Sequence, residues 1–180
     1  DPFAGADLSP EVAAAVSVGP EIPVIDKAVV RETRRTLVEI VPVEVTIRNI
    51  VAGGMAKTFG LEEGIILDEP VLEYHYKNDT LHDPLFTEYH IKAMKLGTDA
   101  ELKAIADMSF KINTLLKEFF SKVNIDLVDF KLEFGRRKGK IILADEISPD
   151  TCRLWEKHTK RKLDKDRFRR DLGNIEEAYQ

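Results

Sequence analysis

The chain contains 180 residues and carries 27 Lys and Arg against 32 Asp and Glu, for a formal net charge of -5. This length fits one ordinary domain or two small ones, and an apolar share of 43% supplies enough residues for a hydrophobic core. A single cysteine excludes a disulfide scaffold and a cysteine-rich zinc module. The negative net charge argues against nucleic acid as the main partner, although the basic residues are numerous enough to build local anion pockets.

The two ends of the chain differ in character from its middle. Residues 1–24 hold four of the eight prolines, and the apolar run from Val12 to Val16 is too short for a stable helix or a membrane span. No basic start followed by an apolar stretch indicates a secretory signal, so we expect a cytoplasmic protein that does not associate with membranes. We predict an irregular N-terminal arm over residues 1–24 and one domain, cut short at its end, over residues 25–180.

Alternation of apolar and polar residues predicts four strands, at residues 37–51, 71–77, 125–135 and 140–145. The alternation is clearest over residues 43–47, and Arg48, which follows, shares a face with Glu44. Pro42 indicates a strand start or an edge position, because proline cannot donate to a strand ladder. A basic turn at residues 136–139 joins the last two strands into a hairpin.

Helical spacing of apolar residues predicts a long helix at residues 98–122. Thr98 and Glu101 form a capping box at its start. The stripe expected to face the core contains Leu102, Ile105, Ile112, Leu116, Phe119 and Val123, with Met108, Phe110 and Leu115 beside it. Shorter helices are expected at residues 55–59, 165–171 and 174–179. Together these elements predict an α+β fold, with a mostly antiparallel sheet and packed helices.

The segment from Leu127 to Gly135 has the most informative pattern. Asp129, Lys131 and Glu133 share one face of the predicted strand, and the opposite, core-facing side is expected to hold Val128, Phe130, Leu132 and Phe134. The charged face can be an exposed sheet surface with cross-strand ion pairs. It can equally be the floor of a site, because two carboxylates can hold magnesium and a lysine between them can meet phosphate or carboxylate.

Other residues supply weaker signals for a site. Asp145 ends the following strand and can share a metal with Glu133 only if the hairpin register places both on one face. The Gly53-Gly54 turn precedes a helix start, where backbone N–H groups can meet a phosphate, although most such turns are only turns. His82 beside Asp83 can suggest acid–base chemistry, but a turn histidine with local hydrogen bonds is the simpler interpretation. No histidine has metal-ligand spacing, and Cys152 has no histidine at a motif distance.

Several segments, taken together, resemble the SAICAR synthetase (phosphoribosylaminoimidazole-succinocarboxamide synthase) family. Residues 40–49, followed by Ala52-Gly53, resemble its first signature, and residues 127–135 match its second signature at every position. Further similar segments follow in the order of the family: Lys77-Asn78-Asp79, His82-Asp83-Pro84, residues 143–150, Arg153-Leu154-Trp155 and Asp164-Lys165-Asp166. The resemblance extends from Thr36 to Gln180, over the larger, ATP-grasp-like part of these enzymes.

The resemblance implies an ATP-dependent ligase of purine biosynthesis. Members of the family join L-aspartate to the carboxylate of carboxyaminoimidazole ribonucleotide and release ADP and phosphate, with ATP and Mg²⁺ as cofactors. ATP converts the carboxylate into an acyl phosphate, which the aspartate amine attacks, so the site needs cationic and metal clamps. The implied partners are these small molecules and, because members often assemble into oligomers, further copies of the chain.

The resemblance also assigns roles to individual positions. Glu133 and Asp145 match the carboxylates that serve ATP and magnesium. Asp129 and Lys131 match positions that line the nucleotide site, and we expect them to be catalytic. The expected substrate-binding residues are Arg48, Gly54, Lys77, Asp83 and Arg153, of which the two arginines match those that hold the ribonucleotide phosphate.

Two departures from the family pattern affect these expectations. The family usually has a phosphate-binding serine where this chain has Gly54, and a lost hydrogen bond to a charged group typically costs about 1–3 kcal/mol. Members also begin with a β-rich lobe whose tyrosine-glycine-lysine-x-lysine stretch covers ATP, and no such stretch occurs here. The resemblance therefore leaves three readings open: a catalytic core, a non-catalytic nucleotide-binding module and a structural scaffold. We expect any activity to be weak, because a missing lid exposes the acyl phosphate to water.

Overall fold

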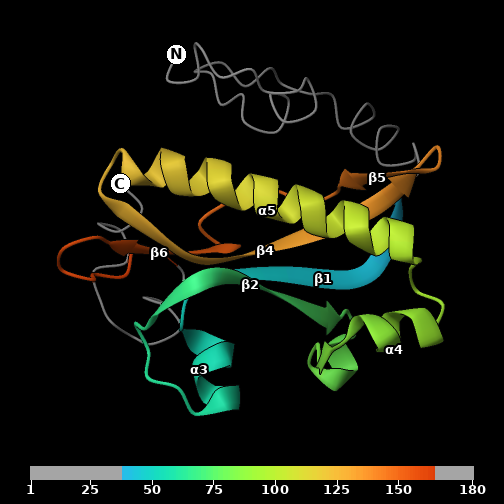
Figure 1. Cartoon of the computed structure of the whole chain (residues 1–180), viewed down its shortest axis with the longest axis horizontal. Coiled ribbons are helices and arrows are strands. Elements are labelled where there is room, and N and C mark those ends of the chain that lie inside the picture. Colours follow the sequence, from blue (N-terminus) through green and yellow to red (C-terminus); the bar gives the residue numbers. More distant parts are fainter. Residues whose placement is uncertain (1–37, 165–180) are drawn as a thin grey trace. The chain divides into compact units, whose positions relative to one another are not determined.

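The computed structural model describes residues 38–164 (Figure 1). The chain separates into two units, residues 1–37 and 38–180, and every described residue belongs to the second. The N-terminal arm predicted at residues 1–24 and the two short helices predicted after residue 164 lie outside the described residues. Among residues 38–164, no helix combines the length and apolar character needed to cross a membrane.

An antiparallel sheet of six strands forms the centre of the described unit (Figure 1). The strand order is β3-β2-β1-β4-β5, and β6 pairs with β4 on the edge that β5 also uses, but at the other end of β4. The strands are β1 (Glu39–Ile50), β2 (Ile66–Tyr76), β3 (Leu85–Phe86), β4 (Ile125–Arg137), β5 (Lys140–Leu143) and β6 (Cys152–Glu156). The sheet confirms the predicted α+β class, and β3 and β6 are additions to the predicted strands.

Within residues 38–164, three α-helices accompany the sheet, and the longest, α5, lies along it (Figure 1). They are α3 (Gly53–Phe59), α4 (Glu88–Ala93) and α5 (Asp99–Ser121), and a short 3-10 helix, η1, spans Asp79–Leu81. The predicted capping box at the start of α5 is confirmed: the Thr98 hydroxyl accepts from the Glu101 N–H, and the Glu101 carboxylate accepts from the Thr98 N–H at 2.8 Å. These bonds satisfy N–H groups that a helix start otherwise leaves unpaired.

The hydrophobic core lies between the sheet and α5. Val45, Ile47 and Phe130 are fully buried on the sheet side, and Leu102 and Ile105 face them from the helix. The predicted set of core-facing residues on this helix is partly wrong. The structure exposes Phe110, Phe119 and Val123 and packs Phe120 against the core, because the buried face of α5 passes through Ser109 and Asn113.

A β-bulge changes the predicted face of Val128. The register between β4 and β6 shifts between Leu127 and Asp129. Leu127 and Phe130 therefore both belong to the main core, whereas Val128 packs in a separate cluster with Ile50, Ala52 and Trp155. An extra residue at a bulge reverses the alternation locally, which is why the pattern misplaced Val128.

Pro42 lies inside β1, which is paired on both sides, and not at a strand start or edge as predicted. The register between β1 and β4 shifts between Ile40 and Glu44, so Pro42 lies within an irregular stretch of the ladder. A bulge is one of the few places where a sheet tolerates a residue that has no N–H.

Two buried amides join α5 to β1. Asn49 and Asn113 donate to each other's side-chain oxygens at 2.8 and 2.9 Å, and Asn49 also donates to the Leu127 carbonyl at 3.2 Å. Both side chains are buried, so each depends on the other for its hydrogen bonds.

Replacing Asn113 should therefore destabilise the fold. We expect Asn113→Ala to lower the free energy of unfolding by about 1–3 kcal/mol, because the Asn49 amide loses a buried partner. Thr114→Ala is the matched control, since the exposed Thr114 hydroxyl bonds only the Phe110 carbonyl one turn back, and it should change the value by less than about 0.5 kcal/mol. Urea denaturation of the three proteins measures the difference, and equal midpoints for the two variants would contradict it.

The start of α5 is also tied to the end of β4 by an ion pair. Arg136 Nε donates to Glu101 Oε1 at 2.5 Å. This hydrogen bond, with those from Thr98, outweighs the opposing effect of burial and lowers the pKa of Glu101 from 4.5 to about 2. A lowered folded-state pKa contributes stability above the unfolded-state value, and that contribution is lost as the pH falls through the folded-state value.

A pH series tests this ion pair. The difference in the free energy of unfolding between the wild type and Glu101→Gln should have its full value above pH 4.5. It should shrink as the pH falls toward about 2. Urea unfolding at fixed pH values measures it. Asp107→Asn, which removes an exposed helix ion pair with Lys103, should show almost no such dependence. A constant difference between the wild type and Glu101→Gln across the acid range would be incompatible with the ion pair described.

Candidate active site

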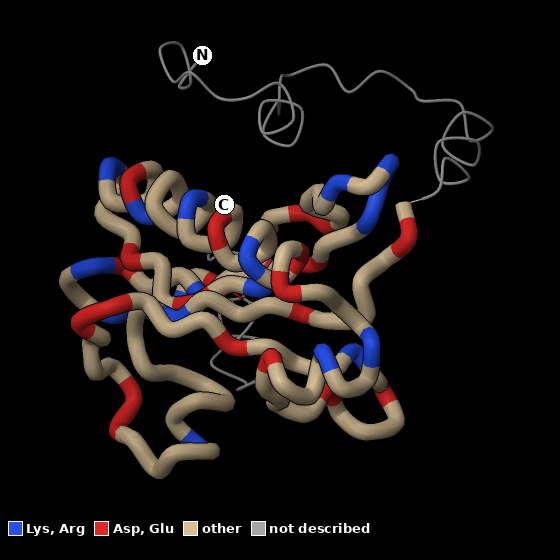
Figure 2. The backbone as a smooth tube through the Cα atoms, turned by 45° about the vertical axis from the view of Figure 1, so that its right-hand side comes forward, with Lys and Arg blue, Asp and Glu red and all other residues tan. Residues whose placement is uncertain are grey.

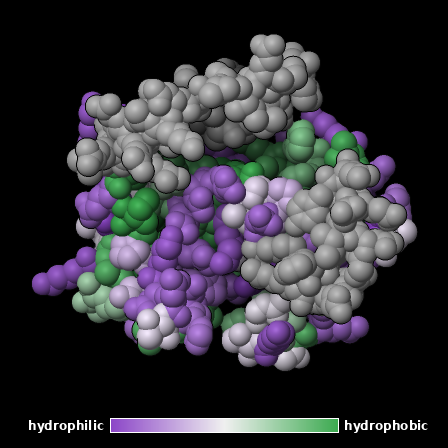
Figure 3. All heavy atoms as spheres, turned by 180° about the vertical axis from the view of Figure 1, so that it is seen from behind, coloured by the Kyte–Doolittle hydropathy of each residue, from purple (hydrophilic) through white to green (hydrophobic). Residues whose placement is uncertain are grey.

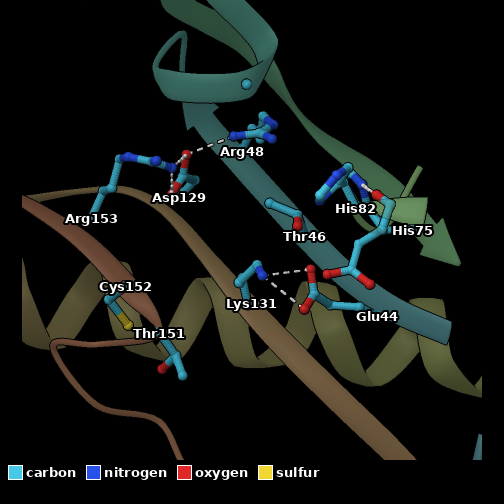
Figure 4. Close-up of a pocket in the computed structure, with 12 residues that line it drawn as sticks. Glu44, Thr46, Arg48, His75, His82, Asp129, Lys131, Thr151, Cys152 and Arg153 are labelled. Carbon is cyan, nitrogen blue, oxygen red and sulfur yellow. Dashed lines mark hydrogen bonds and ion pairs between the residues drawn. The ribbon is translucent and has the colours of Figure 1, made fainter. Parts of the chain in front are cut away.

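Charged and polar side chains gather on the face of the sheet opposite α5 (Figure 4). The register of the two central strands pairs Glu44 with Glu133, Thr46 with Lys131, and Arg48 with Asp129. This confirms that Asp129, Lys131 and Glu133 share one face, and it brings the β1 residues alongside them. The face is therefore built by two strands whose apolar sides are fixed by the core.

A buried carboxylate lies at one end of this face. Asp129 Oδ2 accepts from Arg48 Nη1 at 2.7 Å, and the Asp129 carboxylate also accepts from Arg153 Nη1 at 2.9 and 3.0 Å. Arg153 comes from β6, where it is paired with Asp129 across the strands. Figure 4 shows the two guanidinium groups converging on Asp129, which is only 3% exposed. One carboxylate thus fixes two arginines from different strands.

A second buried carboxylate holds Arg48 from the other side. Glu73, on β2, accepts from Arg48 Nε at 2.7 Å, and its Oε2 also lies 3.3 Å from His75 Nε2. Burial raises the pKa of Glu73, but the hydrogen bonds and charges of His75 and Arg48 outweigh burial and lower it below its usual value. Glu73 therefore remains ionised beside Arg48 at neutral pH.

The glycine turn before α3 lies against both arginines. Gly53 has a φ of +54°, and a Cβ built there would be 2.5 Å from Arg153 Nη2. At Gly54 a Cβ would be 3.5 Å from Arg48 Nη2, an ordinary contact distance. Glycine is therefore favoured at position 53 by its conformation, and a larger residue there would have to displace the Arg153 guanidinium, whereas position 54 has room for a side chain.

A pocket of about 260 Å³ opens over this face. Six of the residues expected to form the site line it: Arg48, Gly54, Asp83, Asp129, Lys131 and Arg153. The other lining residues are Glu44, Thr46, His75, His82, Thr151 and Cys152. Lys131 donates to both carboxylate oxygens of Glu44 at 2.7 Å, as the dashed lines in Figure 4 mark. The polar face is thus the floor of a pocket, and its ion pairs are part of that floor.

The other three expected site residues form a cluster beside the pocket: Lys77, Glu133 and Asp145. Lys77 donates to Glu133. Burial acts to lower the pKa of Lys77, but the hydrogen bond and charge of Glu133, with the charges of Asp145 and Glu44, outweigh it and raise the pKa. Lys77, which was expected among the substrate-binding residues, lies beside the two carboxylates expected to serve ATP and the metal.

The hairpin register does not pair Asp145 with Glu133. The Ala144 N–H donates to the Glu133 carbonyl at 2.9 Å, and β5 has ended one residue earlier. Asp145 lies in the loop after β5, and its charge helps to raise the pKa of Lys77. Within residues 38–164, no group of three or more His, Cys, Asp or Glu side chains could hold a metal by itself. Two carboxylates suit a magnesium ion that arrives with phosphate oxygens and water as its other ligands.

Several residues of the site were not predicted from the sequence. Glu73 and His75 alternate with buried Tyr74 in a predicted strand, and that alternation was the available signal for a polar face there. Thr151 and Cys152 were missed because β6 was not predicted. His82 has the left-handed conformation of a turn residue, with a φ of 58°, so its interpretation as a turn histidine agrees with the structure, although it also lines the pocket.

Charges of both signs are distributed over the described unit. Figure 2 shows acidic and basic positions interspersed along the backbone, and Figure 3 shows a broad hydrophilic area with apolar residues beside it on one face. The pocket lining combines cations and carboxylates, as suits a small polar ligand.

A glycine substitution tests the contact between the turn and Arg153. We expect Gly53→Ala to weaken the binding of inorganic phosphate, because the methyl group would displace the Arg153 guanidinium. Gly60→Ala is the matched control: its φ of +64° carries a similar conformational cost, but no atom lies within 4 Å of the new Cβ. Calorimetric titration measures the affinity, and equal affinities for the two variants would refute the contact as a determinant of binding.

The chain has close relatives of known family. The sequence profile of SAICAR synthetase matches residues 15–180. Phosphoribosylaminoimidazole-succinocarboxamide synthase of Clostridium botulinum (strain Okra / Type B1) is 59% identical over 155 residues, and that of Clostridium novyi is 60% identical over 149 residues. These matches cover 86% and 83% of this chain but only 66% and 63% of the relatives, so the chain spans slightly less than two thirds of their length.

Solved structures give the same result. SAICAR synthetase from Pyrococcus horikoshii is 51% identical with a TM-score of 0.76, and the match covers 79% of this chain and 63% of that one. A SAICAR synthetase in complex with ADP is 52% identical with a TM-score of 0.76, and the match covers 79% and 61%. The family profile, the relatives and the solved structures agree, and the chain belongs to the SAICAR synthetase family.

Proposed function

We propose that this chain contributes the ribonucleotide and ATP site of an ATP-dependent ligase that joins L-aspartate to carboxyaminoimidazole ribonucleotide. The observation that carries the proposal is the pair of arginines fixed by buried Asp129 beside the Gly53-Gly54 turn. Fixed guanidinium groups suit a phosphate monoester, because their donors match phosphate oxygens in pairs. The family shown above supports the ligase, and its ADP-bound member supports the ATP part of the site.

In this proposal the pocket holds the ribonucleotide. Arg48 and Arg153 bind its phosphate, and the Gly54 N–H supplies a further donor where relatives usually have a serine. Asp83 lines the pocket from the loop after η1 and accepts from the Asn78 N–H at 2.8 Å, so its carboxylate is fixed by that loop. The phosphate thereby anchors the imidazole ring and its carboxylate over the polar floor.

Lys131 and Asp129 are the residues proposed to act on the reacting groups. Lys131 lies mid-way along the floor, where its ammonium group can stabilise negative charge that develops as the substrate carboxylate is phosphorylated and then attacked. Glu44 holds that ammonium group in place from the neighbouring strand. Asp129 orients both arginines and presents a carboxylate at the same floor.

Glu133 and Asp145 are the residues proposed to serve ATP and Mg²⁺. Lys77 occupies Glu133 in this structure, and the phosphates of ATP offer the ammonium group an alternative partner. When bound, the metal neutralises phosphate charge and helps to orient the group that is transferred. On this proposal, residues 25–180 are the substrate and ATP-binding domain, the chain is cytoplasmic, and it assembles with further copies of itself.

A second candidate is a non-catalytic nucleotide-binding module. It would use the same fixed arginines as the ligase, so turnover is what separates the two candidates. Binding of the ribonucleotide and ATP without turnover would distinguish it from the ligase. Absence of binding would contradict both candidates and would favour a scaffold.

The ligase is tested by a coupled assay of ADP release that depends on both L-aspartate and the ribonucleotide. We expect Glu133→Ala to lower the rate by about 100-fold or more, as is typical when a group that stabilises transition-state charge is lost. Glu146→Ala is the control, because Glu146 is an exposed carboxylate next to Asp145 and should leave the rate almost unchanged. Equal rates for wild type and Glu133→Ala would refute the assignment of Glu133.

A further inference from the structure

The guanidinium group of Arg48 has one nitrogen left for a ligand. Its Nε donates to Glu73 and its Nη1 donates to Asp129, each at 2.7 Å. No hydrogen bond among residues 38–164 uses Nη2, which lies 3.5 Å from the Cβ position of Gly54, at the pocket wall. The two carboxylates therefore fix the direction in which the remaining donor points.

Glu73 contacts Arg48 without being part of the pocket. Its side chain is only 8% exposed and does not belong to the pocket lining. Glu73 lies on β2, so Arg48 lies between Glu73 and Asp129. The cross-strand partner of Glu73 on β1 is Thr46. An effect of Glu73 that is carried by contacts must therefore reach a ligand in the pocket through Arg48 or through His75.

We infer that Glu73 is a positioning residue, which fixes the Arg48 guanidinium so that Nη2 faces the Gly53-Gly54 turn and which thereby sets the affinity of the pocket for a phosphate group. This inference rests on the proposed function in taking a ribonucleotide phosphate as the ligand of Arg48. It adds a residue outside the pocket to those that determine phosphate binding.

The geometry gives a physical reason for this role. Without Glu73, Asp129 is the only remaining carboxylate bonded to Arg48, and a guanidinium group prefers to meet a carboxylate with two parallel N–H bonds. Arg48 would then turn both of its terminal nitrogens toward Asp129, and Nη2 would no longer be available to a ligand. A ligand phosphate would have to break that pair and to immobilise the freed side chain.

The sign of the effect separates positioning from simple charge. Glu73 is an anion close to a proposed phosphate site, so its removal should strengthen phosphate binding if only Coulomb repulsion mattered. Positioning predicts the opposite, because the arginine loses its productive orientation. The two explanations thus give changes in affinity of opposite direction for the same variant.

Calorimetric titration of the full 180-residue chain with carboxyaminoimidazole ribonucleotide, and separately with inorganic phosphate, tests the inference. We expect Glu73→Ala to bind each probe about tenfold more weakly, the scale of one hydrogen bond between charged groups. Glu73→Gln should stay within about threefold of wild type, because its amide oxygen can still accept from Arg48 Nε. Glu69→Ala, an exposed carboxylate on the same strand, should bind as wild type does.

Each result decides the inference. Binding by folded Glu73→Ala that equals or exceeds wild type overturns it, and so does equal weakening by Glu73→Ala and Glu69→Ala. If Glu73→Ala fails to fold, Glu73→Met keeps the side-chain volume without an acceptor and carries the same expectation. Wild-type binding of phosphate but not of the ribonucleotide contradicts the proposed ligand, and the variants titrated with phosphate still decide the role of Glu73. Binding of neither probe by wild type overturns both.

Discussion

The candidate site depends on the burial of Asp129 between two arginines from different strands. A buried carboxylate is costly unless it is paired and hydrogen-bonded, and Asp129 is paired with both Arg48 and Arg153. The same contacts hold the guanidinium groups beside the glycine turn. The requirement of one buried charge for partners therefore joins β1, β4 and β6 into a single site.

The apolar side of the sheet makes this polar arrangement possible. β1 and β4 place Val45, Ile47 and Phe130 in the core under α5, so a slip of one residue in their register would bury the charged face instead. Core packing thus fixes which side chains share the pocket floor. Fold stability and site geometry are two results of the same register.

The sequence was sufficient for those parts of the structure that depend on local pattern. The capping box at Thr98, the alternation of Asp129 with Lys131, and the hairpin between β4 and β5 could all be predicted, because each depends on residues close together in the chain. The bulge at Val128 could not, since it exists only in the pairing of β4 with β6. Glu73 was missed for a related reason: its role comes from a partner 25 positions away. The resemblance to a family identified six of the twelve pocket residues, but it did not show how they hold one another.

One pairing in the sheet links the lysines of the site to the folding of the chain. Glu44 and Glu133 lie directly opposite each other on β1 and β4, an arrangement of like charges that by itself opposes strand pairing. Lys131 neutralises the first carboxylate and Lys77 the second. A substitution of either lysine therefore has two effects: one on the binding of the ligand and one on the pairing of the two strands. If one of these lysines is replaced by a neutral residue, a neutral replacement of its paired glutamate compensates for the loss. The chain's tolerance of a substitution at each lysine is therefore tied to a substitution at its own glutamate.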